Sequence, residues 1–259
     1  MGTQKSRKFL LCCAIALFAT AAFGQGIYME SNTSGGPLGD KVMPSKTFMM
    51  PKMFRQEGNN EVTIMRLDRE KVYHLDPEKK TYSEMTFAEL EEAAKKASAE
   101  MNSHMAEMQA KMKDMPEAQR QMMEKMMGGK IAGMMSEGKI EVSGPVEKKT
   151  ISGYSCAKFA ATKDGKDYVT IWATKDIKGF DVLRKDWEQF SSKMMSMVPN
   201  GKGLADAFKK VEGVAIQTDM AGITTLVTKV EQQSTPASQF EVPAGYTKVD
   251  SPLKQATAH

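Results

Sequence analysis

Methionine is the side chain with metal-binding chemistry that this sequence concentrates in one place. Eleven of the 23 methionines lie between residues 101 and 135, and one of the three histidines lies among them. Thioether and imidazole groups bind soft metals such as Cu(I) when a helix brings them onto adjoining turns. The candidate ligands are Met101, His104, Met105 and Met108. Because an ordinary helical apolar face produces the same spacing without any metal, copper binding is one alternative among several.

The same methionines form an apolar stripe if the segment is helical. Methionine is flexible and polarisable, so it fills gaps in a core and also suits surfaces that bind varied apolar partners. The stripe therefore predicts either packing on the protein's own core or on a second copy, or a surface for acyl chains, a membrane or an apolar protein. Its residues are Leu90, Met101, Met105, Met108, Met112, Met115, Met122 and Met126.

Catalytic motifs are scarce in this sequence. The three histidines, His74, His104 and His259, have no spacing typical of a metal site. Residues 153–157 lack the second glycine of a nucleophile elbow, and Cys156 within them fits a buried strand position. The acidic residues are scattered, so no carboxylate pair is indicated. We therefore predict no enzyme, no catalytic residue and no cofactor.

The first 24 residues have the pattern of a cleavable export signal. Lys5, Arg7 and Lys8 precede an apolar run over residues 9–23, and small residues allow cleavage after Gly24. The run is short for a membrane span. We therefore predict a periplasmic or secreted protein.

Charge and cysteine content limit the binding partners and the disulfides that can be expected of the mature chain. Cleavage would remove three of the 36 basic residues and none of the 32 acidic ones, which leaves a net charge of 33 − 32 = +1. This balance gives no indication of nucleic-acid binding. Of the three cysteines, only Cys156 would remain, so no internal disulfide is expected. No second apolar run is long enough to predict a transmembrane span after cleavage.

Two helical segments must position these side chains. Residues 86–137 form a methionine-rich helical insertion, which begins with a Thr86–Glu89 capping box and contains Pro116 as a break. Residues 180–198 form a second amphipathic helix. Its predicted apolar side carries Val182, Leu183, Trp187, Phe190, Met194 and Met197.

Strand patterns fill the remainder of the chain. Short alternating runs separated by turn residues indicate an antiparallel meander, and Asp164-Gly165 is the clearest hairpin turn. Residues 47–57 predict one strand despite Pro51, whereas residues 31–39 predict a loop. The sequence therefore predicts an α+β fold.

Several short motifs resemble an exported bacterial domain of unknown function whose layout is similar to that of the periplasmic lipoprotein carriers LolA and LolB. They lie at residues 52–55, 73–77, 79–82, 153–154, 171–172 and 240–246. The resemblance implies an incomplete antiparallel barrel with helices over its concave face, which in those carriers holds acyl chains. The long insertion departs from the carriers, and neither Arg55 nor Arg66 matches their gating arginine.

The combined expectation is one LolA-like α+β domain over residues 25–250, with the helical insertion at 86–137 and a flexible tail at 251–259. The expected function is non-enzymatic binding of a lipid-like or other apolar ligand or partner. The alternatives are copper handling by the methionine-rich helices and self-association through them.

Overall fold

All the strands that the structure describes belong to one β-sheet. The computed structural model of the protein describes residues 25–113, 116, 138–196 and 201–251. In chain order the strands are β1 (Gln25–Gly35), β2 (Met43–Met50), β3 (Met53–Gly58), β4 (Glu61–Arg66), β5 (Lys71–Asp76), β6 (Thr81–Thr86), β7 (Ile140–Ser143), β8 (Lys148–Ile151), β9 (Tyr154–Lys163), β10 (Lys166–Thr174), β11 (Val214–Met220), β12 (Ile223–Ser234) and β13 (Thr247–Lys248).

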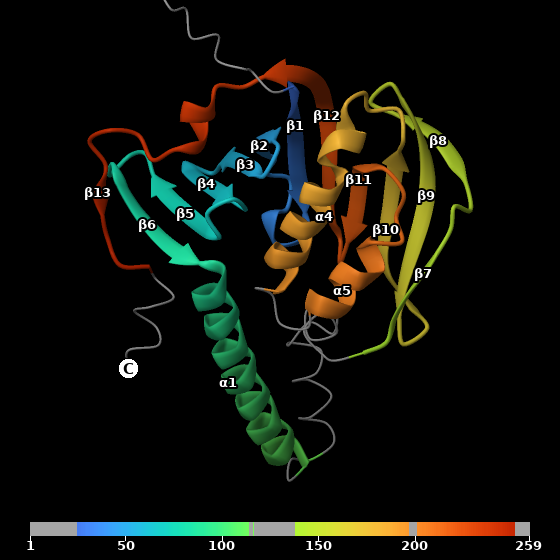
Figure 1. Cartoon of the computed structure of the whole chain (residues 1–259). Helices are drawn as coiled ribbons and strands as arrows, with labels where there is room; N and C mark the ends of the chain where they lie inside the picture. Colours follow the sequence, from blue (N-terminus) through green and yellow to red (C-terminus); the bar gives the residue numbers. More distant parts are fainter. Residues whose placement is uncertain (1–24, 114–115, 117–137, 197–200, 252–259) are drawn as a thin grey trace, which may run out of the picture.

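Helices occupy two of the connections between strands. Helix α1 (Phe87–Lys113) follows β6, while α4 (Phe180–Ser196) and α5 (Gly201–Phe208) lie between β10 and β11. Two short 3-10 helices, η1 (Gly36–Leu38) and η2 (Ala237–Phe240), complete the described elements. Figure 1 shows α4 and α5 lying across the strands at the centre of the sheet.

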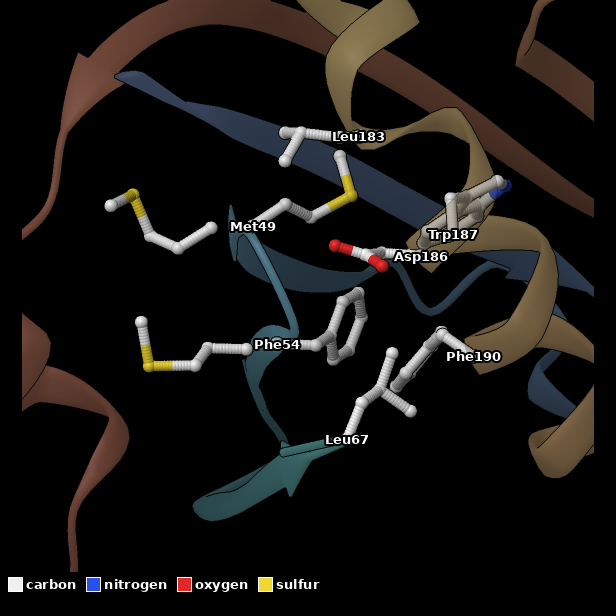
Figure 2. Close-up of a pocket in the computed structure, with 9 residues that line it drawn as sticks. Met49, Phe54, Leu67, Leu183, Asp186, Trp187 and Phe190 are labelled. Atoms are coloured by element: carbon white, nitrogen blue, oxygen red, sulfur yellow. The ribbon is translucent and has the colours of Figure 1, made fainter. Parts of the chain in front are cut away.

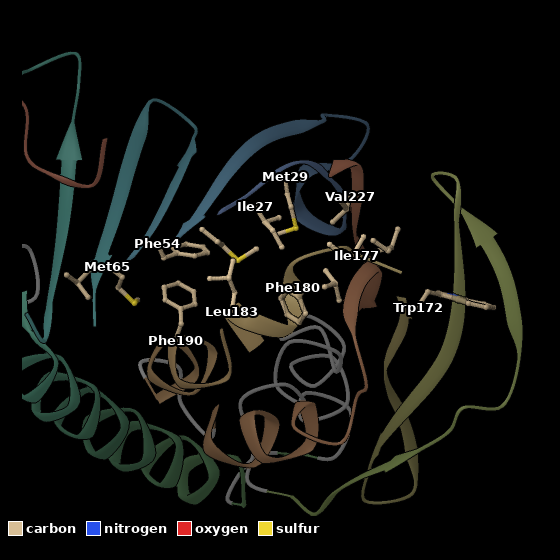
Figure 3. Close-up of a cluster of buried hydrophobic side chains, with 14 of the residues drawn as sticks. Ile27, Met29, Phe54, Met65, Trp172, Ile177, Phe180, Leu183, Phe190 and Val227 are labelled. Carbon is tan, nitrogen blue, oxygen red and sulfur yellow. The ribbon is translucent and has the colours of Figure 1, made fainter. Parts of the chain in front are cut away.

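The sheet is curved and open. Its strand order is β13-β6-β5-β4-β3-β2-β1-β12-β11-β10-β9-β7, and β8 also pairs with β9. Figure 3 shows the strands arching around α4 and α5. Neighbouring strands are antiparallel except for the short β13–β6 pair, and among the described residues the end strands β13 and β7 do not pair with each other. These observations confirm the predicted sheet-rich α+β class with a curved antiparallel sheet.

Turn chemistry explains where several strands end. Asp164 and Gly165 have φ angles of 51° and 76° and join β9 to β10, which confirms the predicted hairpin. The prediction of one strand over residues 47–57 is wrong, because the chain turns at Pro51 and Lys52 between β2 and β3. Proline has no N–H for a ladder, and Lys52 adopts a φ of 60°.

The loop prediction for residues 31–39 is wrong for its first half. Strand β1 continues to Gly35, and residues 31–35 pair with β12 across the whole run. Asparagine and glycine have low strand preference, but pairing with a distant strand supplies the missing stabilisation.

The start of α1 shows the reciprocal hydrogen bonds of a capping box. The Glu89 backbone N–H donates to Thr86 Oγ1 over 3.1 Å, and the Thr86 backbone N–H donates to Glu89 Oε2 over 2.8 Å. These contacts satisfy donors that the first helical turn leaves without partners. The predicted cap at Thr86 is therefore confirmed.

We expect Thr86→Ala to lower the free energy of unfolding by about 1 kcal/mol, because the N-terminal end of α1 loses its cap. Urea unfolding followed by circular dichroism measures this change. Ser98→Ala, within the same helix, removes a hydroxyl that caps nothing and should leave the free energy nearly unchanged. Equal losses in the two variants would contradict a specific role for the cap.

Helix α1 packs on the sheet only through its first two turns among the side chains that the structure describes. Phe87, Leu90 and Ala93 are buried, and the Lys193 ammonium lies 5.4 Å from the Phe87 ring centroid. Figure 1 shows the remainder of α1 extending away from the sheet. No helix in the described ranges is both long and apolar enough to cross a bilayer.

The C-terminal segment consists of residues 237–251, from η2 to the last described residue. It covers the face of the β2–β6 meander that is turned away from α4. Alternation places Val62 and Ile64 on that face and Met65 on the other. Phe240 of η2 is fully buried among a cluster of large apolar side chains. That cluster contains Met50, Val62, Ile64, Tyr73 and Leu75.

An ion-pair network fixes this C-terminal segment in place. Arg66 is buried and pairs with Asp68 over 2.7 Å and with Glu241, which Arg69 also contacts over 2.7 Å. Hydrogen bonding to Arg66 lowers the pKa of the Asp68 carboxyl. Further along, the Thr247 backbone N–H donates to the Lys80 carbonyl over 2.9 Å. The ion pairs therefore join β4 to Glu241, and the backbone bond joins β13 to the turn before β6.

Candidate functional site: a cavity between the sheet and two helices

A cavity of about 320 Å³ lies between α4 and α5 on one side and strands β1, β2, β10, β11 and β12 on the other. Its volume falls in the range of natural small-ligand sites. We call it the sheet–helix cavity. Its position follows from the curvature of the sheet, since an arched layer and a helix cannot pack in contact along their whole length.

The strands supply a floor that alternates between apolar and hydroxyl side chains. Across the sheet, Ile171 pairs with Thr218, and Thr218 pairs with Thr225. Met29 pairs with Thr47 in the neighbouring ladder. These five residues all line the cavity, so its floor can contact an apolar chain while offering hydroxyl groups.

Helix α4 supplies the roof through one stripe of its surface. The lining residues recur every three or four positions, as one helical face requires. They include Phe180, Arg184, Trp187, Ser191 and Met195. Figure 3 shows Phe180 and Leu183 pointing from α4 toward the strands that carry Met29 and Val227.

A neighbouring aromatic cluster anchors the roof to the sheet. The rings of Phe54 and Phe190 stack with centroids 3.8 Å apart, and Trp187 lies 5.6 Å from Phe190. Figure 2 shows these rings around a small hollow beside Leu183 and Leu67. The hollow holds only about 20 Å³, room for a single water molecule. We therefore assign the aromatic cluster to packing and not to ligand binding.

Asp186 beside that hollow has a structural partner. Its Oδ2 accepts a 2.8 Å hydrogen bond from the Lys52 backbone N–H. This bond connects α4 to the β2–β3 turn, where Lys52 has a positive φ. Asp186 therefore stabilises the position of α4.

Charged side chains lie only at the edge of the cavity. Arg184, Glu188 and Lys209 are the ionisable residues of its lining. Arg184 pairs with Asp181 over 2.9 Å, and Lys209 pairs with Asp206 over 2.8 Å. The pKa of Glu212, next to the lining residues Val211 and Gly213, is lowered mainly by hydrogen bonding to Lys175 and more weakly by the charge of Arg184.

The residues predicted to form the binding stripe do not line this cavity where the structure describes their side chains. Leu90 is buried in the core at the start of α1. Met101, Met105, Met108 and Met112 lie on α1, but their side chains are outside the described part, and Met115, Met122 and Met126 are outside it entirely. No described lining residue comes from α1.

The copper alternative is not tested by the described residues. His104 is exposed on α1, and the side chains of its three proposed methionine partners are not described. Within the described ranges, His, Cys, Asp and Glu side chains form no group of three that is arranged to hold a metal.

Sequence reasoning predicted the apolar side of α4 but assigned no binding site to it. The amphipathic pattern of α4 correctly placed Leu183 and Phe190 on its buried side, but Val182 is 76% exposed and that part of the prediction is wrong. Trp187 was also placed on the apolar side, and it lies between the aromatic cluster and the cavity. Helical periodicity alone does not show that a hollow lies beneath a buried face.

A family described as "Domain of unknown function (DUF4412)" matches residues 104–246, more than half of the 259-residue chain. The chain belongs to this family. The DUF4412 match includes α4, α5 and strands β7 to β12, and therefore most elements that enclose the cavity. No curated protein matches the sequence.

The chain is also similar to solved structures of PNGF-II in the C2 and P21 space groups. In both, identity is 10%, the TM-score is 0.38 and 90% of this chain is covered. The chain spans only 32% and 33% of the length of those proteins. No functional conclusion follows from a likeness at this level, and these matches show no relationship to LolA or LolB.

Proposed function

We propose that this DUF4412 protein binds an acyl chain or similar apolar ligand in the sheet–helix cavity and catalyses no reaction. The observation that supports the proposal most directly is the cavity itself, which has the volume of a ligand site and a mainly apolar lining that also carries hydroxyl groups and three ionisable side chains. The resemblance of short motifs to an exported domain whose layout is similar to that of the LolA and LolB carriers agrees with it. The export signal predicted for residues 1–24 would place the protein where acyl chains need a carrier.

The lining favours a flexible apolar ligand over a polar one. Ile171, Val214 and Val227 are buried strand residues, and Phe180 is a buried aromatic side chain of α4. Each methylene group that moves from water into such surroundings contributes about 0.8 kcal/mol. Affinity should therefore rise about fourfold for each methylene added to the ligand, until the chain fills the cavity.

The two tryptophans allow a direct test. Trp187 lines the cavity, whereas Trp172 lies on the opposite side of β10, with the Lys149 and Lys158 ammonium groups 5.6 and 5.7 Å from its ring. Delipidated Trp172→Phe protein keeps Trp187 as its reporter, and Trp187→Phe keeps Trp172. Titration with 1-dodecanol should change the emission of Trp187 saturably and leave that of Trp172 unchanged.

Equilibrium dialysis with radiolabelled dodecanol measures binding in the wild-type protein at the same time. Saturable binding with the response confined to Trp187 would support the sheet–helix cavity as the site. Absence of binding by dialysis would refute the proposed function, and an equal response of both tryptophans would place the ligand elsewhere.

A further inference from the structure

The charged side chains at the edge of the sheet–helix cavity allow the ligand to be specified further, on the basis of the proposed function. Two cations, Arg184 and Lys209, and one acid, Glu188, belong to the lining. The cations come from α4 and from the residue that follows α5, and α4 and α5 pack against each other. Positive charge therefore exceeds negative charge among the groups that a bound molecule would meet.

Arg184 connects the apolar interior with this edge. Its guanidinium carbon lies 5.9 Å from the ring centroid of Phe180, which also lines the cavity. Helix α4 packs against α5, and the segment that follows α5 supplies the lining residues Lys209, Val211 and Gly213. The lining of the cavity thus combines a guanidinium and an ammonium group with apolar surface.

The present partners of these cations are surface carboxylates that a ligand can replace. The side chain of Asp181, which pairs with Arg184, is 88% exposed, and that of Asp206, which pairs with Lys209, is 56% exposed. Exposed ion pairs of this kind contribute little to stability. A ligand anion beside the apolar lining would compete well, since the planar guanidinium binds carboxylate or phosphate oxygens through two parallel hydrogen bonds.

The acidic groups near this edge leave the cations available. Glu212 pairs with Lys175 outside the lining, and Asp181 and Asp206 face solvent. Glu188 is the one acidic lining residue, and it is exposed one helical turn after Arg184. Its carboxylate would oppose an anionic ligand, so its removal should have the opposite effect to removal of Arg184.

We propose that the ligand is an anionic amphiphile, whose acyl chain occupies the sheet–helix cavity and whose carboxylate or phosphate headgroup binds Arg184 and Lys209. A free fatty acid and a phospholipid both carry such a group. The apolar chain provides most of the affinity, and the two cations provide the selectivity for headgroup charge.

Four ligands with the same chain length test the headgroup: dodecanoate, dodecyl phosphate, 1-dodecanol and dodecylammonium, each below its micelle concentration. We expect at least one of the two anions to bind about tenfold more tightly than the alcohol, and the cation to bind most weakly. Tighter dodecanoate binding indicates a fatty acid, and tighter dodecyl phosphate binding indicates a phospholipid. The preference should decrease at high ionic strength.

Single substitutions test which residues are responsible for the selectivity for headgroup charge. Arg184→Gln and Lys209→Gln should each weaken anion binding about tenfold and leave dodecanol binding unchanged. Glu188→Gln should tighten anion binding, which gives a gain that loss of folding cannot imitate. Lys185→Gln, a neighbouring exposed lysine outside the lining, is the matched control and should change nothing.

Equal affinities for dodecanoate, dodecyl phosphate and dodecanol would overturn the headgroup assignment while leaving the proposed apolar binding intact. Failure of all four ligands to bind would refute the proposed function and this inference together.

Discussion

Replacing Thr218 with tryptophan is expected to abolish ligand binding. Thr218 lies in the floor of the sheet–helix cavity, between its cross-strand neighbours Ile171 and Thr225. An indole at this position would project into the space beneath α4, and close-packed walls leave a displaced ligand no alternative room. We expect the dissociation constant for a dodecyl ligand to rise by at least about a hundredfold.

Thr170→Trp is the matched control for this variant. Thr170 is also a half-buried strand threonine, but it precedes the lining residue Ile171 and is not part of the lining. Alternation along β10 directs its side chain to the other face of the sheet. This control should retain wild-type affinity in equilibrium dialysis, and circular dichroism with thermal melting checks that both variants fold.

These measurements distinguish ligand binding in the sheet–helix cavity from binding at another site. Tight binding by Thr218→Trp would show that the ligand lies elsewhere, with the methionine-rich insertion as the next candidate. Equal loss in Thr170→Trp would indicate a general effect of the added indole and would also contradict the cavity assignment. A smaller loss in Thr218→Phe than in Thr218→Trp would show that the occupied volume determines the effect.

Local chemistry made parts of this fold predictable from the sequence. The Thr86–Glu89 capping box and the Asp164-Gly165 turn depend on residues within four positions of each other, so their pattern contains the whole interaction. The strand over Ser31–Gly35 was missed because β12, which pairs with the whole run, lies nearly two hundred residues later, whereas the nearby β2 pairs only as far as Thr33. The residues near Ser31 in the sequence give no indication of the pairing with β12.

The candidate site was hidden for the same reason. The row formed by Ile171, Thr218 and Thr225 exists only once β10, β11 and β12 pair in register. The methionine stripe drew attention because its spacing is visible within one segment. The α4 face, which covers the cavity, shows a similar spacing with ordinary apolar residues such as Trp187, and so it was predicted only as the apolar side of an amphipathic helix.

Replacing Phe240 with alanine is expected to cause the largest loss of stability among the changes considered. Phe240 has no exposed surface and fills the cluster on the outer face of the β2–β6 meander. Removing a buried aromatic ring costs its transfer free energy and leaves a cavity, together about 3–5 kcal/mol. Urea unfolding at neutral pH measures the free energy change.

Val249→Ala is the control within the same C-terminal segment. Its side chain is 43% exposed, and its backbone N–H donates to the Tyr82 carbonyl over 2.8 Å, a bond that alanine preserves. We expect a change below about 0.5 kcal/mol. A comparable loss in both variants would mean that the segment is generally sensitive and that the buried ring has no special role.

The Phe240→Ala variant also tests whether a loss of stability changes ligand binding. Phe240 packs with Val62 and Ile64, whereas the α4 side of the sheet is reached by the alternate residue Met65. Ligand affinity of folded Phe240→Ala protein should therefore remain close to wild type, even though the protein unfolds at a much lower urea concentration. If affinity falls with stability, the two faces of the meander are coupled, and the C-terminal segment helps to set the curvature that creates the cavity.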